Sequence, residues 1–226
     1  MTAHNPLLPT IAVLGGTGKE GPGLAMRWAH AGYKIIIGSR QAEKAQATAV
    51  ELNQKLGIDF IEGMQNDDAA RKADISVLTV VFSAHEDAVR GLRDALQGKI
   101  LVDATARVDF RDPRPPAPPS APSMAQDILG SGVRVVGAFQ TVPSHVLKKN
   151  LGESLDTDVL VCSDDADAAD RVIQLAEAGG MRAYYGGSLE NSVVVEGMAA
   201  VMISLNKNYA VRTASISITG VPRKES

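Results

Sequence analysis

Short apolar runs alternate with longer stretches of helical spacing along most of the chain. Each run is rich in valine, isoleucine or leucine and too short for a helix, as β-strands are. The apolar residues in a run are mostly consecutive, which is typical of strands covered on both faces. The eight runs are TIAVLGG, YKIIIGS, IDFIE, ISVLTVVF, KILVDAT, VRVVGAF, DVLVC and, more weakly, RAYYGG. Strands that alternate with helices form right-handed βαβ units, so the pattern predicts an α/β fold with a doubly wound, mostly parallel sheet.

The helices and one long loop complete this outline. We expect helices at residues 24–31, 41–56, 164–178 and 191–209. Residues 111–122 hold six of the eleven prolines and therefore predict an extended surface loop, either a plain connection or part of a lid. Val194, Met198, Val201, Met202 and Leu205 follow helical spacing in the last helix. They indicate either packing onto the sheet or, because Val193, Val195 and Ala199 are also apolar, a dimer contact.

A glycine-rich loop follows the first run. Gly16, Gly18 and Gly21 form GxGxxG between a predicted strand and a predicted helix, the context in which this motif binds dinucleotides. Gly16 is expected to allow the tight turn, Gly18 to let the backbone approach a pyrophosphate, and Gly21 to let the helix lie close. We therefore expect Thr17, Lys19 and Glu20 to share in cofactor binding.

The chain is expected to have two parts. Residues 8–140 are predicted to be a Rossmann domain, and residues 141–226 are predicted to be a smaller α/β part that forms the substrate cleft and the dimer contact.

The second run indicates which dinucleotide is bound. It ends in Ser39 and Arg40, where NAD-binding domains carry an acidic residue for the ribose hydroxyls. A carboxylate would repel a 2′-phosphate, whereas a hydroxyl and a guanidinium bind it. Lys44, one turn into the next helix, is placed to reach the same phosphate. The sequence thus favours NADP(H) over NAD(H).

The ends of the later strands supply the other half of the predicted cofactor site. Val80, Val81 and Phe82 follow the fourth run and Ala104 follows the fifth, at the edge where such sheets bind ligands. Phe82 is either a wall for the nicotinamide ring or a core aromatic. His85 is expected at the surface at a helix start, with contact to the cofactor as the alternative.

Composition narrows the function. The formal net charge of −3 comes from scattered charges, which argues against nucleic-acid and anionic membrane partners. The start of the chain does not resemble a signal peptide and no apolar run is long enough to span a bilayer, so we expect a cytoplasmic protein. The four histidines lack metal-ligand spacing, and no metal is predicted. Cys162 lies within an apolar run and is expected to be a buried thiol.

With these residues in place, the chain resembles the NADPH-dependent reductases of coenzyme F420, an 8-hydroxy-5-deazaflavin. The matching segments, in order from Ile11 to Asn208, are GGTGKEGPGLAMRWAHAG, IIIGSR, GAFQTVPSHVL, DVLVCSDD and GGSLENSVVVEGMAAVMISLN. The resemblance implies hydride transfer between NADP(H) and a deazaflavin stacked on its nicotinamide. In such enzymes positioning carries most of the catalysis, so no catalytic acid or base is expected.

The resemblance also implies roles for residues after the sixth run. Ala138 would lie behind the nicotinamide, and Gln140, Val142, Pro143 and Ser144 would line the second substrate's pocket. Gln140 stands where the family commonly has histidine. A flavin, a pterin or a ferric chelate therefore stays open as the second substrate, and a non-catalytic NADP-binding regulator stays open as the role. A hydroxy-acid dehydrogenase is disfavoured because the last helix offers only Lys207, near its far end, as an acid.

Overall fold

A six-stranded parallel sheet forms the centre of the molecule. The computed structural model describes residues 4–222. The strands lie in the order β3-β2-β1-β4-β5-β6, and every neighbouring pair is parallel. Their bounds are β1 Ile11–Leu14, β2 Ile35–Ser39, β3 Ile61–Gln65, β4 Ile75–Leu78, β5 Ile100–Asp103 and β6 Arg134–Gly137. This order is that of dinucleotide-binding sheets, so the predicted fold class is confirmed.

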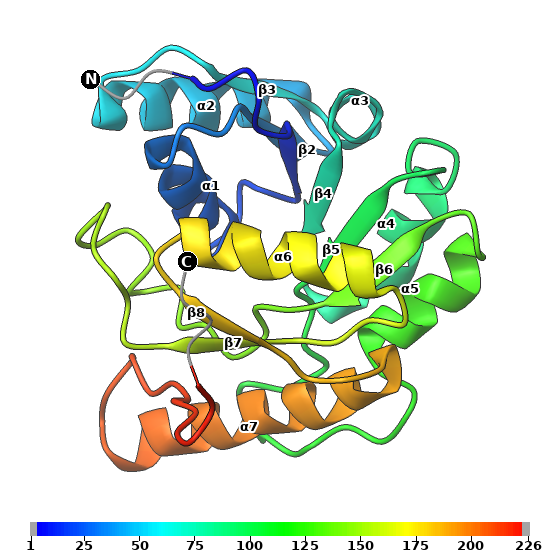
Figure 1. Ribbon diagram of the computed structural model, residues 1–226, viewed down its shortest axis with the longest axis vertical. Coiled ribbons are helices and arrows are strands. Elements are labelled where there is room, and N and C mark those ends of the chain that lie inside the picture. The colour runs from blue at the N-terminus through cyan, green and yellow to red at the C-terminus, as the bar shows by residue number, and fades with distance from the viewer. Residues whose placement is uncertain (1–3, 223–226) are drawn as a thin grey trace.

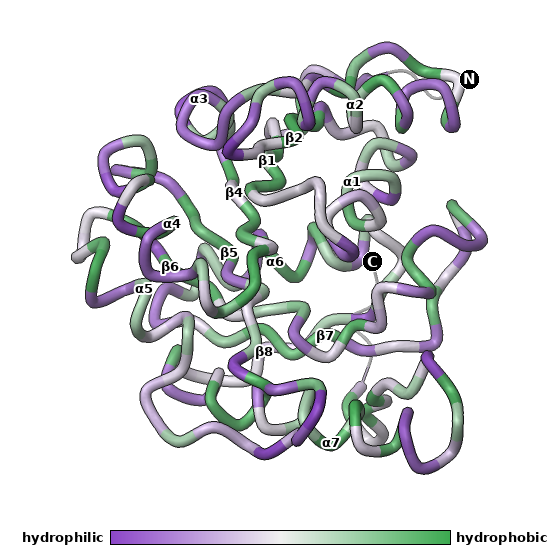
Figure 2. Tube along the Cα trace, turned by 180° about the vertical axis from the view of Figure 1, so that it is seen from behind, coloured by the Kyte–Doolittle hydropathy of each residue, from purple (hydrophilic) through white to green (hydrophobic). Residues whose placement is uncertain are grey.

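Helices cover both faces of this sheet (Figure 1). One hydrophobic cluster joins the sheet to α1 (Gly21–His30), α2 (Ala42–Leu56) and α6 (Ala166–Ala178). A second cluster joins the other face to α3 (Asn66–Lys72), α4 (His85–Leu92) and α5 (Ala121–Leu129). Figure 2 shows β1 and β4 as hydrophobic in the interior, while α2 and α3 at the rim are largely hydrophilic. Burial on both faces explains why the strands read as continuous apolar runs.

The C-terminal part carries a second, smaller sheet. Its two strands, β7 (Asp158–Val161) and β8 (Arg182–Tyr185), are parallel and flank α6 in sequence. An antiparallel bridge between Gly137 and Cys162 joins the two sheets, with N to O distances of 2.8 and 2.9 Å. Cys162 is buried, as predicted, and burial raises the pKa of its thiol to about 11.

Several boundaries differ from those predicted, and two of the differences have a clear local cause. Helix α1 begins at Gly21 rather than Leu24, because Pro22 fits the first turn, where no N–H is required. The proline-rich loop ends earlier than expected, because Ala121 and Pro122 form the first turn of α5. Ser120 caps that helix by accepting a hydrogen bond from the Ser123 amide at 3.1 Å.

Helix α7 (Ser192–Asn208) lies below the small sheet, after a short 3-10 turn at Leu189–Asn191 (Figure 1). The face that packs inward carries Val195, Glu196 and Ala199, whereas Val194 is 57% exposed and Val201 53% exposed. The prediction that Val194 and Val201 pack onto the sheet is therefore wrong, because the inward face is offset by one residue. Within residues 4–222 there is no helix whose length and apolarity would let it cross a bilayer.

Candidate functional site

The glycine loop joins β1 to α1 at the carboxyl edge of the sheet. Gly15, rather than Gly16, makes the left-handed turn, with φ +69°. Gly16 is required for another reason, since a Cβ there would lie 2.5 Å from the Val13 carbonyl oxygen. A Cβ on Gly21 would lie 2.6 Å from the Gly16 Cα, so α1 packs directly against the loop, as the sequence predicted.

Gly18 differs from the other glycines of the motif. It is exposed, and a Cβ there would meet nothing closer than 3.6 Å. Packing within the chain therefore does not explain a glycine at this position. The loop itself is held by Asn66, the first residue of α3, whose Oδ1 accepts a hydrogen bond from the Gly15 amide at 3.1 Å. Asn66 was not foreseen, although its place after a parallel strand puts it at the ligand-binding edge.

A group of cations and hydroxyls lies beside the glycine loop. Ser39 is buried at the end of β2, and its Oγ accepts from the Gln41 amide at 3.2 Å, which leaves its hydroxyl hydrogen available. Arg40 follows it and is exposed, as are Lys19 in the loop and Lys44 in the first turn of α2. Among residues 4–222, these three cations form no ion pair with a carboxylate. This corner therefore presents positive charge that the described chain does not neutralise.

Glu20 is the one acidic residue in the loop. Its Oε1 is buried and has no hydrogen-bond partner within the described residues. Burial raises the pKa of the Glu20 carboxyl to about 8. The side chain is therefore largely protonated at neutral pH, and it does not oppose the binding of an anion as an exposed carboxylate would.

The end of β4 presents an exposed aromatic ring. Phe82 begins a short 3-10 helix, Phe82–Ala84, and is 40% exposed, so the core-aromatic alternative is wrong. Val81 before it is 69% exposed, whereas Val80 is half-buried and packs on the glycine loop, with its Cγ1 2.7 Å from where a Gly15 Cβ would lie. The Arg107 guanidinium lies 5.9 Å from the centre of the Phe82 ring.

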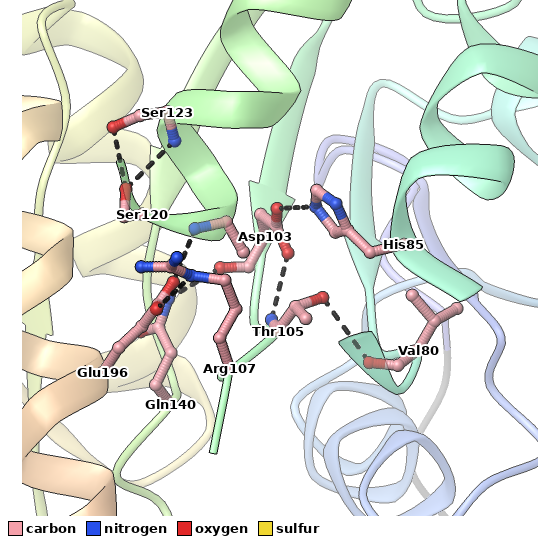
Figure 3. A network of polar contacts seen from close by, with 10 residues as sticks. Val80, His85, Asp103, Thr105, Arg107, Ser120, Ser123, Gln140 and Glu196 are labelled. Atoms are coloured by element: carbon pink, nitrogen blue, oxygen red, sulfur yellow. Dashed lines mark hydrogen bonds and ion pairs between the residues drawn. The ribbon is translucent and has the colours of Figure 1, made fainter. Parts of the chain in front are cut away.

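A buried polar network supports these strand ends (Figure 3). His85 Nε2 and Asp103 Oδ2 are 2.6 Å apart, and both side chains are fully buried. His85 was expected at the surface or in contact with the cofactor. Both expectations are wrong, because the side chain is buried in the core, where it pairs with Asp103 at the end of β5. Asp103 Oδ1 accepts from the Thr105 amide at 3.0 Å, and the Thr105 hydroxyl donates to the Val80 carbonyl at 3.5 Å. The network thus links the ends of β4 and β5.

Gln140 joins this network from the end of β6. Its Nε2 donates to the Asp103 carbonyl oxygen at 2.9 Å, and its Oε1 is buried without a partner in the described chain (Figure 3). Ala104 and Ala138 are buried, and the Ala138 amide donates to the same carbonyl at 3.3 Å. These two alanines therefore lie beneath the surface of the carboxyl edge and are not exposed on it. Gln140 is half-buried and reaches the rim.

Residues 141–153 form an irregular loop after β6. Val142 is buried and its amide donates to the Phe139 carbonyl at 3.0 Å, while Pro143 and Ser144 are half-buried. Phe139, just before the loop, has φ +75°, a conformation that costs a non-glycine residue on the order of 1–3 kcal/mol. The chain therefore turns sharply where it leaves the sheet.

The proline-rich loop is tied to α7 instead of lying free. Glu196 of α7 is fully buried, and accepts from Arg107 Nε at 2.8 Å and from the Ala121 amide at 2.6 Å. Burial raises the pKa of the Glu196 carboxyl. Arg107 also donates to the Ala117 carbonyl at 2.8 Å, and Lys207 donates to the Arg111 carbonyl at 2.9 Å. These contacts indicate that the proline-rich loop forms a fixed wall and not a mobile lid. They also show that Lys207 lies against this loop.

The carboxyl edge of the sheet therefore brings together the exposed backbone at Gly18, a group of cations beside it, the exposed ring of Phe82 and the half-buried amide of Gln140. Within residues 4–222, no three histidine, cysteine or carboxylate side chains gather as a metal would need. The buried His85–Asp103 pair and the Arg107–Glu196 pair were not foreseen, because they join residues of different elements that are 18 and 89 positions apart. Such an edge can bind an anionic dinucleotide and hold a second planar molecule.

Several known proteins resemble this chain in sequence and in fold. The family model of coenzyme F420-dependent NADP oxidoreductases matches residues 10–107. An F420-dependent NADP reductase of Methanothermobacter thermautotrophicus is 40% identical over 225 residues, covering 95% of this chain and 97% of the relative. The enzyme of the same name from Methanocaldococcus jannaschii is 39% identical, with coverage of 93% and 98%. A crystal structure from Arthrobacter sp. FB24, assigned to the same kind of reductase, superposes with a TM-score of 0.78 at 25% identity, covering 94% of this chain and all of the other.

Proposed function

The chain belongs to the family of F420-dependent NADP reductases, and we propose that its carboxyl edge holds NADP(H) and a deazaflavin so that a hydride passes between them. The observation that carries the proposal is the exposed Gly18 beside a group of cations that residues 4–222 do not neutralise. No packing within the chain requires a glycine there, whereas a pyrophosphate lying against the backbone does.

The dinucleotide side of the site is assigned to the first two strand ends. Gly16, Thr17, Gly18 and Gly21 would present backbone and hydroxyl groups to the pyrophosphate, next to Lys19 and the protonated Glu20. Ser39, Arg40 and Lys44 would bind the 2′-phosphate, for which charge-assisted bonds from a guanidinium are strong. This set makes NADP(H) the cofactor rather than NAD(H).

The nicotinamide and second-substrate side is assigned to the later strand ends. Val80, Val81, Phe82, Ala104 and Ala138 would surround the nicotinamide. When both rings are bound, the cofactor supplies the hydride chemistry. The chain contributes positioning and the exclusion of water.

The second ring would lie against the loop after β6. Gln140, Val142, Pro143 and Ser144 would line its pocket, and the wall made by Arg107 and the proline-rich loop would close one side. The amide of Gln140 offers a fixed polar group there, because the Asp103 carbonyl orients it. The division into residues 8–140 and 141–226 also stays a prediction.

The assembly and the compartment are proposals as well. Val194 and Val201 lie seven residues apart on the exposed face of α7, with the half-buried Met198 and Leu205 on the same face. An exposed apolar stripe of this kind supports a homodimer in which the two α7 helices meet. We further propose that the reaction takes place in the cytoplasm.

Stopped-flow absorbance tests the function directly. NADPH and the protein are mixed in turn with the deazaflavin, with flavin mononucleotide and with a pterin, and the rate of NADPH oxidation is ranked. We expect the deazaflavin to react fastest. A faster flavin or pterin would reassign the second substrate, and tight NADPH binding without oxidation by any acceptor would instead support a regulatory protein.

A further inference from the structure

Arg27 is a buried cation that no carboxylate in the described part of the chain balances. It lies on α1 and is 3% exposed, and burial lowers the pKa of its guanidinium. Within residues 4–222 it forms no ion pair, and it donates instead to backbone carbonyls of two segments. The five acceptors are the carbonyl oxygens of Leu147 (3.0 Å), Lys149 (2.6 Å), Asn150 (3.4 Å), Glu153 (3.2 Å) and Gly179 (3.0 Å). A planar guanidinium with five N–H donors suits such a set, and a lysine ammonium does not.

Four of these five acceptors belong to the loop that follows the proposed pocket. Residues 141–153 form neither helix nor strand, and single-turn bonds such as Val146 N to Pro143 O at 3.0 Å are their local support. A loop of this kind has no ladder of backbone bonds to fix its shape. Its downstream half therefore depends on Arg27 for its position.

The next residue of α1 supports the upstream end of the same loop. The rings of Trp28 and Phe139 meet edge to face, with centroids 5.8 Å apart and an interplanar angle of 71°. The Trp28 indole donates to the Leu175 carbonyl at 2.8 Å, which fixes the ring. This contact buttresses Phe139 in the positive-φ turn that leads into Gln140.

The loop also touches the backbone of α1. A Cβ on Gly23 would lie 2.6 Å from the Leu147 Cβ, so only glycine allows this approach. The same helix begins at Gly21, inside the glycine loop. One rigid element thus carries the proposed pyrophosphate loop at its start and the proposed second-substrate loop along its side.

We propose that Arg27 is the positioning residue of the second-substrate loop, setting where Gln140 to Ser144 lie relative to the bound nicotinamide. The inference rests on the proposed function, since it assigns that loop to the second ring. Hydride transfer is sensitive to small displacements, and a shift of about 1 Å can cost on the order of 100-fold in rate. Arg27 acts through the loop and not on either substrate.

The test compares Arg27→Lys and Arg27→Met with Leu92→Ala, a core change in the opposite helical layer. For Arg27→Lys we expect the KM for the deazaflavin to rise and kcat to fall, together reducing kcat/KM roughly 10- to 100-fold. The Kd for NADPH should change less than about twofold, because the glycine loop is untouched. Hydrogen exchange should quicken in residues 140–153 and not across the sheet.

The outcomes separate this inference from the proposed function. An Arg27→Lys protein that matches Leu92→Ala in deazaflavin KM and in exchange of residues 140–153 would overturn the role of Arg27. Loss of NADPH affinity equal to the loss for the deazaflavin would also overturn it, since that pattern reports general destabilisation. If the wild type does not reduce the deazaflavin at all, the proposed function fails, and loop exchange alone decides whether Arg27 holds the loop.

Discussion

The protonated Glu20 in the glycine loop makes stability depend on pH in a calculable way. Its carboxyl pKa rises from 4.5 to about 8 through burial. Below pH 4.5 the group is neutral in both the folded and unfolded states and costs nothing. As pH rises towards 8 the unfolded state gains stability by releasing a proton that the folded state retains, and above 8 the folded protein carries a buried carboxylate.

The magnitude follows from the two pKa values. Their difference corresponds to at most about 5 kcal/mol. Part of the residue still reaches solvent, so a carboxylate there keeps some of its hydration, and we expect a cost on the order of 2 kcal/mol. Glu20→Gln keeps the shape of the side chain and removes the proton equilibrium. We expect it to be about 2 kcal/mol more stable, relative to wild type, at pH 9 than at pH 5.

Urea unfolding of the cofactor-free protein at intervals from pH 5 to pH 9 measures this difference. Glu43→Gln, which changes an exposed glutamate on α2, serves as the matched control and should parallel the wild type. A gap between Glu20→Gln and wild type that stays constant over the whole range would show that the carboxyl is already ionised in the folded state. The reasoning about its burial would then be refuted.

Four further substitutions probe the site and its support. Arg40→Ala should weaken NADPH binding roughly 10- to 100-fold by calorimetry and leave NADH binding nearly unchanged, because it removes charge-assisted bonds to the 2′-phosphate; equal losses would contradict the assignment. The Gly18→Ala protein should unfold at the wild-type temperature and bind NADPH poorly. The Gly21→Ala protein should lose about 1–3 kcal/mol of stability, because the added Cβ clashes with the backbone of Gly16. The opposite pattern would reverse the roles of the two glycines. His85→Ala should cost about 2–4 kcal/mol in denaturant unfolding, because it leaves Asp103 buried without its partner, and a loss below about 1 kcal/mol would argue against the pair.

The sheet could be predicted from the sequence because strands buried on both faces leave an unmistakable apolar run. The same logic placed the candidate site, since the carboxyl ends of parallel strands meet at one edge. The spacing of the motif assigned the tight turn to Gly16, and this assignment was wrong by one residue. Gly15 has the positive φ. At Gly16 the nearby Val13 carbonyl oxygen leaves no room for a side chain.

The buried polar groups could not be foreseen for a different reason. An arginine within a helix and a histidine at a helix start are usually exposed, and the acceptors of Arg27 lie 120 or more residues away in the chain. Arg107 and Glu196 are also far apart in the sequence, so their pairing could not be predicted from local patterns. Local patterns report which residues are apolar, and long-range polar pairing depends on the finished fold.

Within residues 4–222, a continuous hydrophobic cluster runs from β1 through α1 and α6 to β7 and leaves no hinge between the two sheets. Opening the molecule between its two sheets would separate side chains that are packed at interior density, which is too costly for each round of turnover. At the proposed site, entry of the second substrate and release of product would therefore rely on movements of the rim, and not on the domain closure by which many dehydrogenases seal their clefts. A chain built in this way would keep water from the proposed site through fixed packing around the bound rings, without a closing movement of one part on another.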